Sequence, residues 1–184
     1  MGTVRMGGCF LALGLVVGLG ACSSTWVAND ENLANRGYPT AQVDLASAYL
    51  RGEDVKKDPV AAAYWTHRAA RQGLPEAQNN MGVLYARGTG VEQDFVEAAR
   101  WYRLAADQDY TKAQVNLGLA YDLGLGVPSD TQAAAYWWGK AAAAGDPAAR
   151  SNLRQLREAA WAVPACDSTG IPKSWRCPTR FGMR

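Results

Sequence analysis

Hydrophobic positions in the middle of the chain recur with a spacing of 36 residues. Ala41, Ala77 and Ala113 are 36 residues apart, and many other positions follow the same offset. The recurrent positions of the central unit, each with counterparts on both sides, are Ala77, Met81, Tyr85, Gly88, Val91, Asp94, Ala98, Trp101 and Ala105. So many coincidences at one offset predict an internal repeat, with units at 41–76, 77–112 and 113–148.

The first half of each unit predicts a helix, here named helix A. In the central unit it covers about residues 76–87, where Met81, Leu84 and Tyr85 recur at helical spacing on one face. Gly88 follows and supplies the left-handed residue that commonly ends a helix. Val91, in the turn after it, is expected to tuck into the core.

The second half predicts helix B, from Asp94 to about Asp107. Asp94 is a good N-cap, and Glu97 three residues later is expected to complete a capping box. One tryptophan recurs on the buried side of this helix in every unit, and it is expected in the core rather than on a ligand platform. These core residues are Trp65, Trp101 and Trp137, whereas their neighbours Tyr102 and Trp138 are expected to be partly exposed.

Together these positions read A-x-x-N-L-G-x-x-Y, then G-x-G-V, then D-x-x-x-A-x-x-W. The pattern resembles the Sel-1-like repeat, a relative of the tetratricopeptide repeat, over roughly residues 34–157. The resemblance implies an all-α fold: a right-handed α/α solenoid of about three full repeats plus capping helices, over residues 33–160. The first unit departs at Asp54, where the others have Gly90 and Gly126, so its loop is expected to be less tightly turned.

Both ends of the repeat array are predicted to be caps. Residues 34–39 align with 70–75, so a stunted helix B is expected before the first unit. The last helix, 148–161, places Arg154 and Arg157 where the preceding unit has Gly118 and Tyr121. Charges at these positions are expected to end the stacking.

The first residues are typical of a targeting signal. A basic start is followed by an apolar stretch too short to span a bilayer, which predicts a signal peptide over 1–21. Leu19, Gly20, Ala21 and Cys22 then resemble a bacterial lipobox, which implies lipidation of Cys22 and a lipid anchor. The alternative is plain secretion. Residues 22–32 are polar enough for a tether, and Ser23 after Cys22 favours the outer membrane, facing the periplasm.

The two remaining cysteines lie in the C-terminal tail, residues 161–184. Cys166 and Cys177 are expected to form a disulfide, because the periplasm is oxidising; a metal site is the alternative, but no further ligand lies nearby. Lys173, Arg176 and other basic residues of this tail predict either a solvated segment or a contact with anionic lipid or cell-wall polymer.

Composition and charge narrow the class of partner. The chain of 184 residues is 48% hydrophobic and 20% charged, which is typical of a globular protein. Its formal net charge is only +2, so nothing steers it toward nucleic acid.

Candidate chemistry is sparse in the repeats, so neither an enzyme nor a cofactor, metal or small-molecule substrate is expected. His67, the only histidine, aligns with Arg103 and Gly139, which favours a solvated face over a catalytic role. No nucleophile stands at a known spacing from it. The Gly-x-Gly pair Gly88 and Gly90 joins two predicted helices, so it is interpreted as turn geometry rather than a phosphate loop.

The best candidate site is the concave groove that helix A lines in tetratricopeptide-like folds. Its expected partner-binding residues are Val43, Ser47, Arg51, Asn79, Val83, Arg87, Val115, Leu119 and Asp122, with Leu50, Ala86 and Leu123 beside them. The alternative is that these side chains simply pack within the solenoid. The Asn and Lys of a carboxylate clamp are missing. Asp44, Asn80, Asn116 and Asn152 are expected to bond to neighbouring backbone and hold the repeats in register.

These features predict a non-catalytic scaffold or adaptor lipoprotein of the bacterial envelope that binds a peptide or protein. Two alternatives stay open. One is a cell-wall or β-lactam-acting enzyme of the cysteine-rich repeat type, although residues 41–157 contain no Cys. The other is a self-associating structural subunit of an envelope or motility complex.

Overall fold

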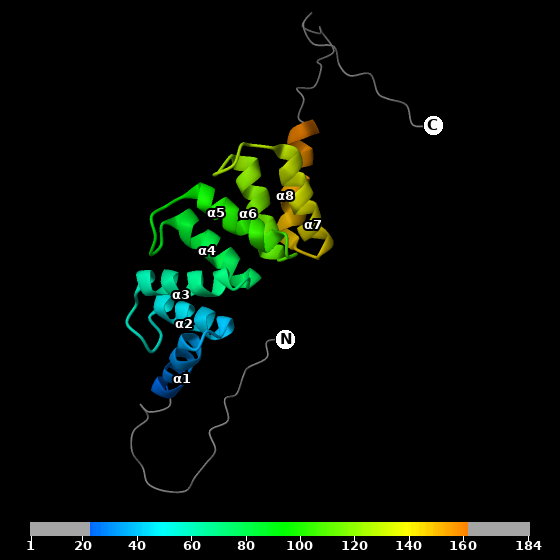
Figure 1. The fold of residues 1–184 in the computed structure, drawn as a ribbon. Coiled ribbons are helices and arrows are strands. Elements are labelled where there is room, and N and C mark those ends of the chain that lie inside the picture. Colours follow the sequence, from blue (N-terminus) through cyan, green and yellow to red (C-terminus); the bar gives the residue numbers. More distant parts are fainter. Residues whose placement is uncertain (1–22, 162–184) are drawn as a thin grey trace, which may run out of the picture.

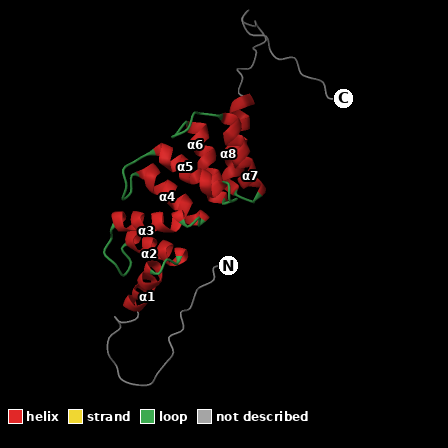
Figure 2. Cartoon of the chain, in the orientation of Figure 1, coloured by secondary structure: helices red, strands yellow, loops and turns green. Residues whose placement is uncertain are grey.

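The computed structural model describes residues 23–161, and in that range every regular element is an α-helix (Figures 1 and 2). The helices are α1 Ser23–Asn35, α2 Pro39–Arg51, α3 Pro59–Arg71, α4 Pro75–Arg87, α5 Phe95–Ala106, α6 Thr111–Leu123, α7 Thr131–Ala143 and α8 Pro147–Trp161. The predicted signal peptide, Cys22 and the two tail cysteines lie outside the described residues.

The helices stack in chain order. Each one packs mainly on the helix before it and the helix after it, so the array rises from α1 to α8 without folding back (Figure 1). Helices α2, α4 and α6 are the A helices of the three units, and α3, α5 and α7 are the B helices. This arrangement confirms the predicted all-α solenoid, in which each pair of helices buries its apolar face against its neighbours.

Aspartate N-caps and left-handed glycines set the helix ends. Asp94 Oδ1 accepts hydrogen bonds from the backbone N–H of Val96 (2.8 Å) and of Glu97 (3.1 Å), and the equivalent Asp58 and Asp130 do the same in their units. Gly88 ends α4 with φ 65°, as predicted.

The capping box itself is only half formed. The Asp94 N–H donates to the Tyr85 carbonyl at 3.0 Å rather than to Glu97. The Glu97 carboxylate instead forms an ion pair with Arg100 at 2.9 Å. The predicted reciprocal bond was therefore wrong, because the loop brings a backbone acceptor to the Asp94 N–H and leaves Glu97 free to pair along its own helix.

The loop of the first unit is turned like the other two, contrary to expectation. Asp54 has φ 58°, close to the 71° of Gly90 and the 73° of Gly126. Aspartate is one of the few residues that tolerate this left-handed region. Gly90 is more constrained, since a Cβ there would lie 1.9 Å from the Pro59 carbonyl oxygen.

The segment expected to be a tether and a stunted helix is a full helix. α1 has 13 residues, as many as α2, and its C-terminal end buries Ala34 against α2. The Ala34 carbonyl also accepts a hydrogen bond from Gln42 Nε2 at 3.0 Å. The prediction weighed the polar residues of this segment and missed that its few apolar residues supply a packing face and a backbone acceptor.

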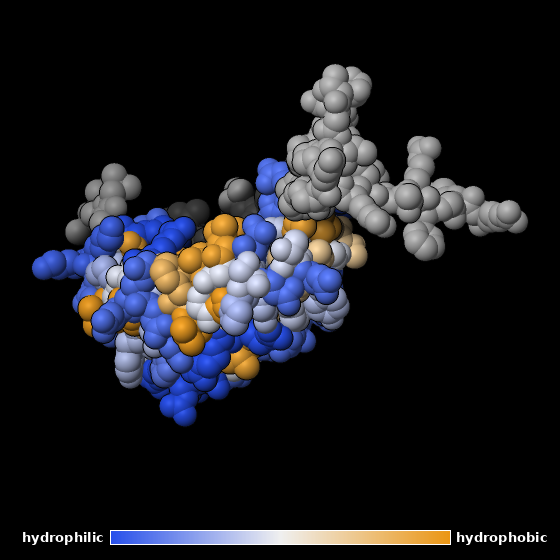
Figure 3. Space-filling model, turned by 90° about the horizontal axis from the view of Figure 1, so that it is seen from above, coloured by the Kyte–Doolittle hydropathy of each residue, from blue (hydrophilic) through white to orange (hydrophobic). Residues whose placement is uncertain are grey.

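The tryptophans of helix B form the core, as predicted. Trp65, Trp101 and Trp137 are all buried, each within one of the apolar clusters that run between successive helices. Val91 is half-buried against the same core. On the face shown in Figure 3, hydrophobic side chains form separate patches among hydrophilic ones.

A ladder of glutamines, rather than the asparagines, bonds the repeats to neighbouring backbone. The buried Gln78 donates from Nε2 to the Ala70 carbonyl at 3.4 Å and accepts from Gln108 Nε2 at 2.7 Å. Gln42 and Gln114 occupy equivalent buried positions. Each glutamine thus adds a side-chain donor to a carbonyl at the C-terminal end of the preceding helix, and that carbonyl also accepts a hydrogen bond from a backbone N–H of the following turn.

The C-terminal helix ends the described array with charge. α8 starts at Pro147, next to the predicted start, and exposes both Arg154 and Arg157. In the preceding unit the residues at these positions, Gly118 and Tyr121, are buried and half-buried. Among the described helices, none combines the length and apolar character needed to cross a bilayer.

Candidate functional site

The residues predicted to line a groove divide into buried and accessible sets. Val43 and Asn79 are only 8% and 5% exposed, so they are not available to a partner. Val43 joins an apolar cluster, and Asn79 Oδ1 accepts a hydrogen bond from Asn116 Nδ2 at 2.9 Å. Their assignment as contact residues was therefore wrong, because adjacent A helices close over them.

The accessible positions form a line across the three A helices. Ser47, Val83 and Leu119 are equivalent residues 36 positions apart; the first two are half-buried and Leu119 is 42% exposed. Leu123, one turn further along α6, is 58% exposed. We call this line the A face. Val115, also predicted for the groove, is half-buried and packs against the last apolar cluster.

Charged residues mark the C-terminal edge of the A face. Arg51 is exposed and pairs with Glu53 at 2.7 Å, while Arg87 and Asp122 occupy the ends of α4 and α6 and are also exposed. These three predicted residues therefore border the apolar line instead of lying within it.

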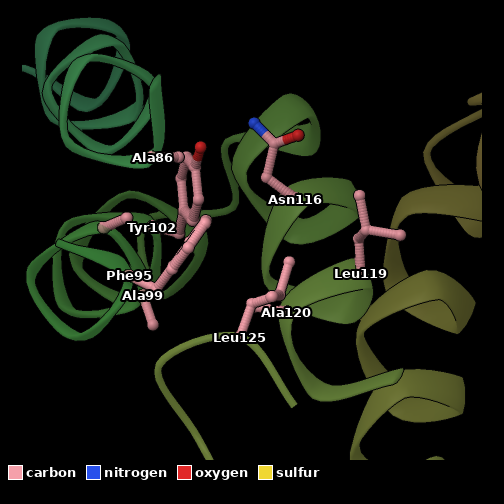
Figure 4. Close-up of a pocket in the computed structure, with 9 residues that line it drawn as sticks. Ala86, Phe95, Ala99, Tyr102, Asn116, Leu119, Ala120 and Leu125 are labelled. Carbon is pink, nitrogen blue, oxygen red and sulfur yellow. The ribbon is translucent and has the colours of Figure 1, made fainter. Parts of the chain in front are cut away.

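Two hollows open on this face, at equivalent places in the first and second units. The first-unit hollow measures about 210 Å³ and is lined by Val43, Ala46, Ser47, Leu50, Thr66, Asn80, Val83 and Leu84. The second-unit hollow measures about 90 Å³ and is lined by Ala86, Phe95, Ala98, Ala99, Tyr102, Asn116, Leu119, Ala120 and Leu125 (Figure 4). Thr66 and Tyr102 are equivalent residues, as are Asn80 and Asn116.

A ring on helix B, seated against a glycine on helix A, explains the smaller hollow. A Cβ at Gly82 would lie 2.5 Å from Tyr102 Cε1, and a Cβ at Gly118 would lie 2.4 Å from Trp138 Nε1. The glycines therefore make room for the rings, which are 8% and 3% exposed. The expectation that Tyr102 and Trp138 are partly exposed was wrong, because residues on the partner helix decide their burial.

The polar ends of these rings are accommodated differently. Trp138 Nε1 donates to the Val115 carbonyl at 3.1 Å, which satisfies the indole N–H in the core. Burial raises the pKa of Tyr102 to about 12, and the charge of Arg87 partly opposes that rise.

The first unit replaces both members of this pair. Ala46 stands at the glycine position and Thr66 at the ring position. Thr66 is buried, and its hydroxyl donates to the Ala62 carbonyl on its own helix at 2.8 Å. The groove prediction missed Ala46, Thr66 and Asn80 as lining residues, although the change from Gly with Tyr or Trp to Ala with Thr was visible in the repeat alignment.

The histidine and the loop glycines considered for catalysis or phosphate binding have contacts that a purely structural role explains. His67 is half-buried, and its ring meets that of Trp101 edge-on at 5.9 Å between centroids. Gly88 and Gly90 lie in a loop between two helices, both at positive φ. Lys140 Nζ forms an ion pair with Asp109 at 2.8 Å and lowers the pKa of that carboxyl group.

Comparisons with solved structures place this geometry among known solenoids. A protective antigen of uropathogenic Escherichia coli with an SLR fold matches with a TM-score of 0.70 and 37% identity, over 71% of this chain and 28% of the antigen. A Sel1 repeat protein from Oxalobacter formigenes matches with a TM-score of 0.65 and 36% identity, over 70% of this chain and 97% of that protein. The chain therefore spans under a third of the first relative and nearly all of the second.

A third solved structure shares the fold alone. Helicobacter pylori cysteine rich protein B is 16% identical, with a TM-score of 0.60 over 73% of this chain and 99% of that protein. No curated protein matches the chain.

A family model confirms the repeats. The Sel1 repeat model matches residues 39–74, 75–110 and 111–146, more than half of the chain. Its units begin two residues before the expected boundaries, at the first residues of α2, α4 and α6. With three matched repeats and this structural likeness, the chain belongs to the Sel1 repeat family.

Proposed function

We propose that this protein is a non-catalytic adaptor of the bacterial cell envelope, which binds a peptide or protein partner on its A face. Sel1 repeat folds commonly serve as scaffolds for protein interactions. The observation that carries the proposal is the exposure of Leu119 and Leu123 on α6, beside the second-unit hollow. Neighbouring large apolar side chains left in water on one helix face are typical of an interaction surface.

The sequence supports the location. The signal-like residues 1–21 and the lipobox at Cys22 favour a lipid anchor, with the solenoid in the periplasm and the anchor in the outer membrane. The substitution Cys22→Ser tests this part directly. It is expected to move the protein from the membrane fraction to the soluble periplasmic fraction, and unchanged fractionation would contradict the anchor.

A photo-crosslinking amino acid tests the binding surface in cells. Placed at Leu119 it is expected to form an adduct with a partner, whereas at Tyr136, a more accessible position on α7, it forms none. Adding Leu123→Asp to the first variant is expected to abolish the adduct, because it puts a charge on the apolar surface. Identical adducts from both positions, or none from either, would count against an A-face adaptor.

The same experiment separates the proposal from self-association. An adduct of twice the chain mass at Leu119 identifies a second copy as the occupant and favours a structural subunit. The enzymatic alternative has less support, since the likeness to the cysteine-rich protein reaches only the fold and residues 41–157 contain no Cys.

A further inference from the structure

We propose that the first-unit hollow is a socket for an aromatic side chain, preferably tryptophan, supplied by the bound partner. This inference rests on the proposed adaptor function and names the chemistry that one part of the A face recognises. The hollow lies between α2, α3 and α4 and is lined by residues of all three helices.

The repeats themselves show what this position takes. In the second and third units the equivalent place holds a ring from the chain itself, Tyr102 or Trp138, packed against Gly82 or Gly118. In the first unit Thr66 supplies no ring, and its hydroxyl is turned back onto the Ala62 carbonyl. The hollow there is about 210 Å³, compared with about 90 Å³ where Tyr102 is present. The first unit therefore has no ring of its own at this place, and the methyl group of Ala46 replaces the glycine against which the other rings pack, so a ring from a partner must lie beside that methyl group in the hollow.

The lining fits an aromatic ring that carries a donor. Most lining residues are apolar and favour a flat hydrophobic group, while Ser47 and Asn80 add polar atoms at the accessible side. In the third unit the Trp138 N–H donates to the Val115 carbonyl at 3.1 Å. The residue equivalent to Val115 is Val43, which lines the first-unit hollow. The Val43 carbonyl is thus the equivalent acceptor at the first-unit hollow.

The socket also adjoins the accessible line of the A face. Ser47 and Val83 belong both to that line and to the hollow. A partner segment lying across α2, α4 and α6 would place one side chain over the hollow and others over Leu119. This arrangement, with an anchor in a pocket and weaker contacts around it, is common in peptide recognition.

A titration of the full chain with N-acetyl-tryptophanamide tests the socket without knowledge of the partner. Amide chemical shifts of the 15N-labelled protein are expected to change around Ser47, Thr66 and Val83. N-acetyl-leucinamide is expected to bind at least about tenfold more weakly, because it lacks both the ring and the N–H donor. No saturable change with the tryptophan probe, or equal binding of both probes, would overturn the proposal.

Filling the socket provides the decisive variant. The double substitution Ala46→Gly with Thr66→Tyr recreates the Gly82 and Tyr102 pair and is expected to reduce probe binding at least about tenfold. Gly139→Ala is the matched control, since a Cβ there meets nothing within 4 Å, and it is expected to leave binding unchanged. Full probe binding by the filled variant would overturn the proposal.

Two further measurements keep the test independent of folding and of the adaptor function. If far-UV circular dichroism shows that the double variant is not helical, Ser47→Phe crowds the same hollow from α2 and is expected to give the same loss. A dimer that dissociates when the socket is filled, seen by sedimentation, would assign the hollow to a second copy and overturn the proposal. Failure of the Leu119 crosslink with intact probe binding would reject the adaptor surface but not the socket.

Discussion

Gly118 on α6 and Trp138 on α7 make a size-matched pair whose energetics can be measured. A methyl group at position 118 would lie 2.4 Å from Trp138 Nε1, so Gly118→Ala forces the ring to move. Overpacking costs about 1–3 kcal/mol, and loss of the indole bond to the Val115 carbonyl leaves a buried N–H unpaired at about 1–3 kcal/mol. Helix propensity returns about 1 kcal/mol, so we expect a net destabilisation of about 1–5 kcal/mol.

Gly118→Ala should stabilise the protein instead of destabilising it when the ring of Trp138 is absent. Trp138→Thr removes the indole. The double variant Gly118→Ala with Trp138→Thr then carries the same pair as the first unit, which has alanine at position 46 and threonine at position 66. Trp138→Thr alone should cost about 3–5 kcal/mol as a cavity-forming change. In that background Gly118→Ala meets no ring and should stabilise by about 1 kcal/mol through helix propensity and partial filling of the cavity.

Urea unfolding of the four proteins of this double-mutant cycle, followed by far-UV circular dichroism, measures the coupling between the two sites. Gly139→Ala is the control for helix propensity alone, since open space surrounds that position, and should stabilise by about 1 kcal/mol. The reasoning is refuted if Gly118→Ala has the same sign and size with and without the Trp138 ring.

Three more predictions concern the rest of the described solenoid. Asp94→Ala should lower the free energy of unfolding by about 1 kcal/mol, because the N–H groups of Val96 and Glu97 lose their cap, and an unchanged melting temperature would contradict it. Gln78→Ala should cost about 1–3 kcal/mol in urea unfolding, because it removes the buried amide that joins two repeats; a cost no larger than that of an exposed Gln93→Ala would argue against the ladder. The pKa of Tyr102 is about 12 in the folded chain and about 10 when unfolded, so folding favours the neutral phenol. The contribution of this pKa shift to the free energy of unfolding is fully present below pH 10 and is lost as the pH rises toward 12. Tyr102→Phe should therefore reduce the fall of stability between pH 10 and 12. The same dependence of stability on pH in both proteins would exclude the effect.

Local signals account for the part of the fold that was predicted. The offset of 36 residues, the face shared by Met81 and Tyr85, and the terminators Gly88 and Asp94 all act within a few residues of the positions they affect. They therefore located the helices and the buried tryptophans. Asp54 also shows the limit of a residue-type argument, because its backbone adopts the same left-handed turn as the glycines.

The candidate site was predicted only in part, for reasons of packing. Helical spacing placed Val43, Asn79 and Leu119 on one line, but only contacts with the next helix decide which of them remains accessible. Asn79 is closed over and bonded to Asn116 on α6, whereas Leu119 stays exposed. A single-helix pattern contains no information about the neighbour that covers it.

Spacing along the chain is enough to define the repeat, the helix pairs, the residues that cap them and the family. Contacts between helices were needed to show that α1 is a full helix packed on α2, that glutamines join the repeats, and that Tyr102 and Trp138 are buried. The tertiary structure also revealed the hollow beside Thr66. The physical reason is that burial is a property of pairs: whether a ring is hidden depends on whether the helix 20 residues earlier presents a glycine or a methyl group.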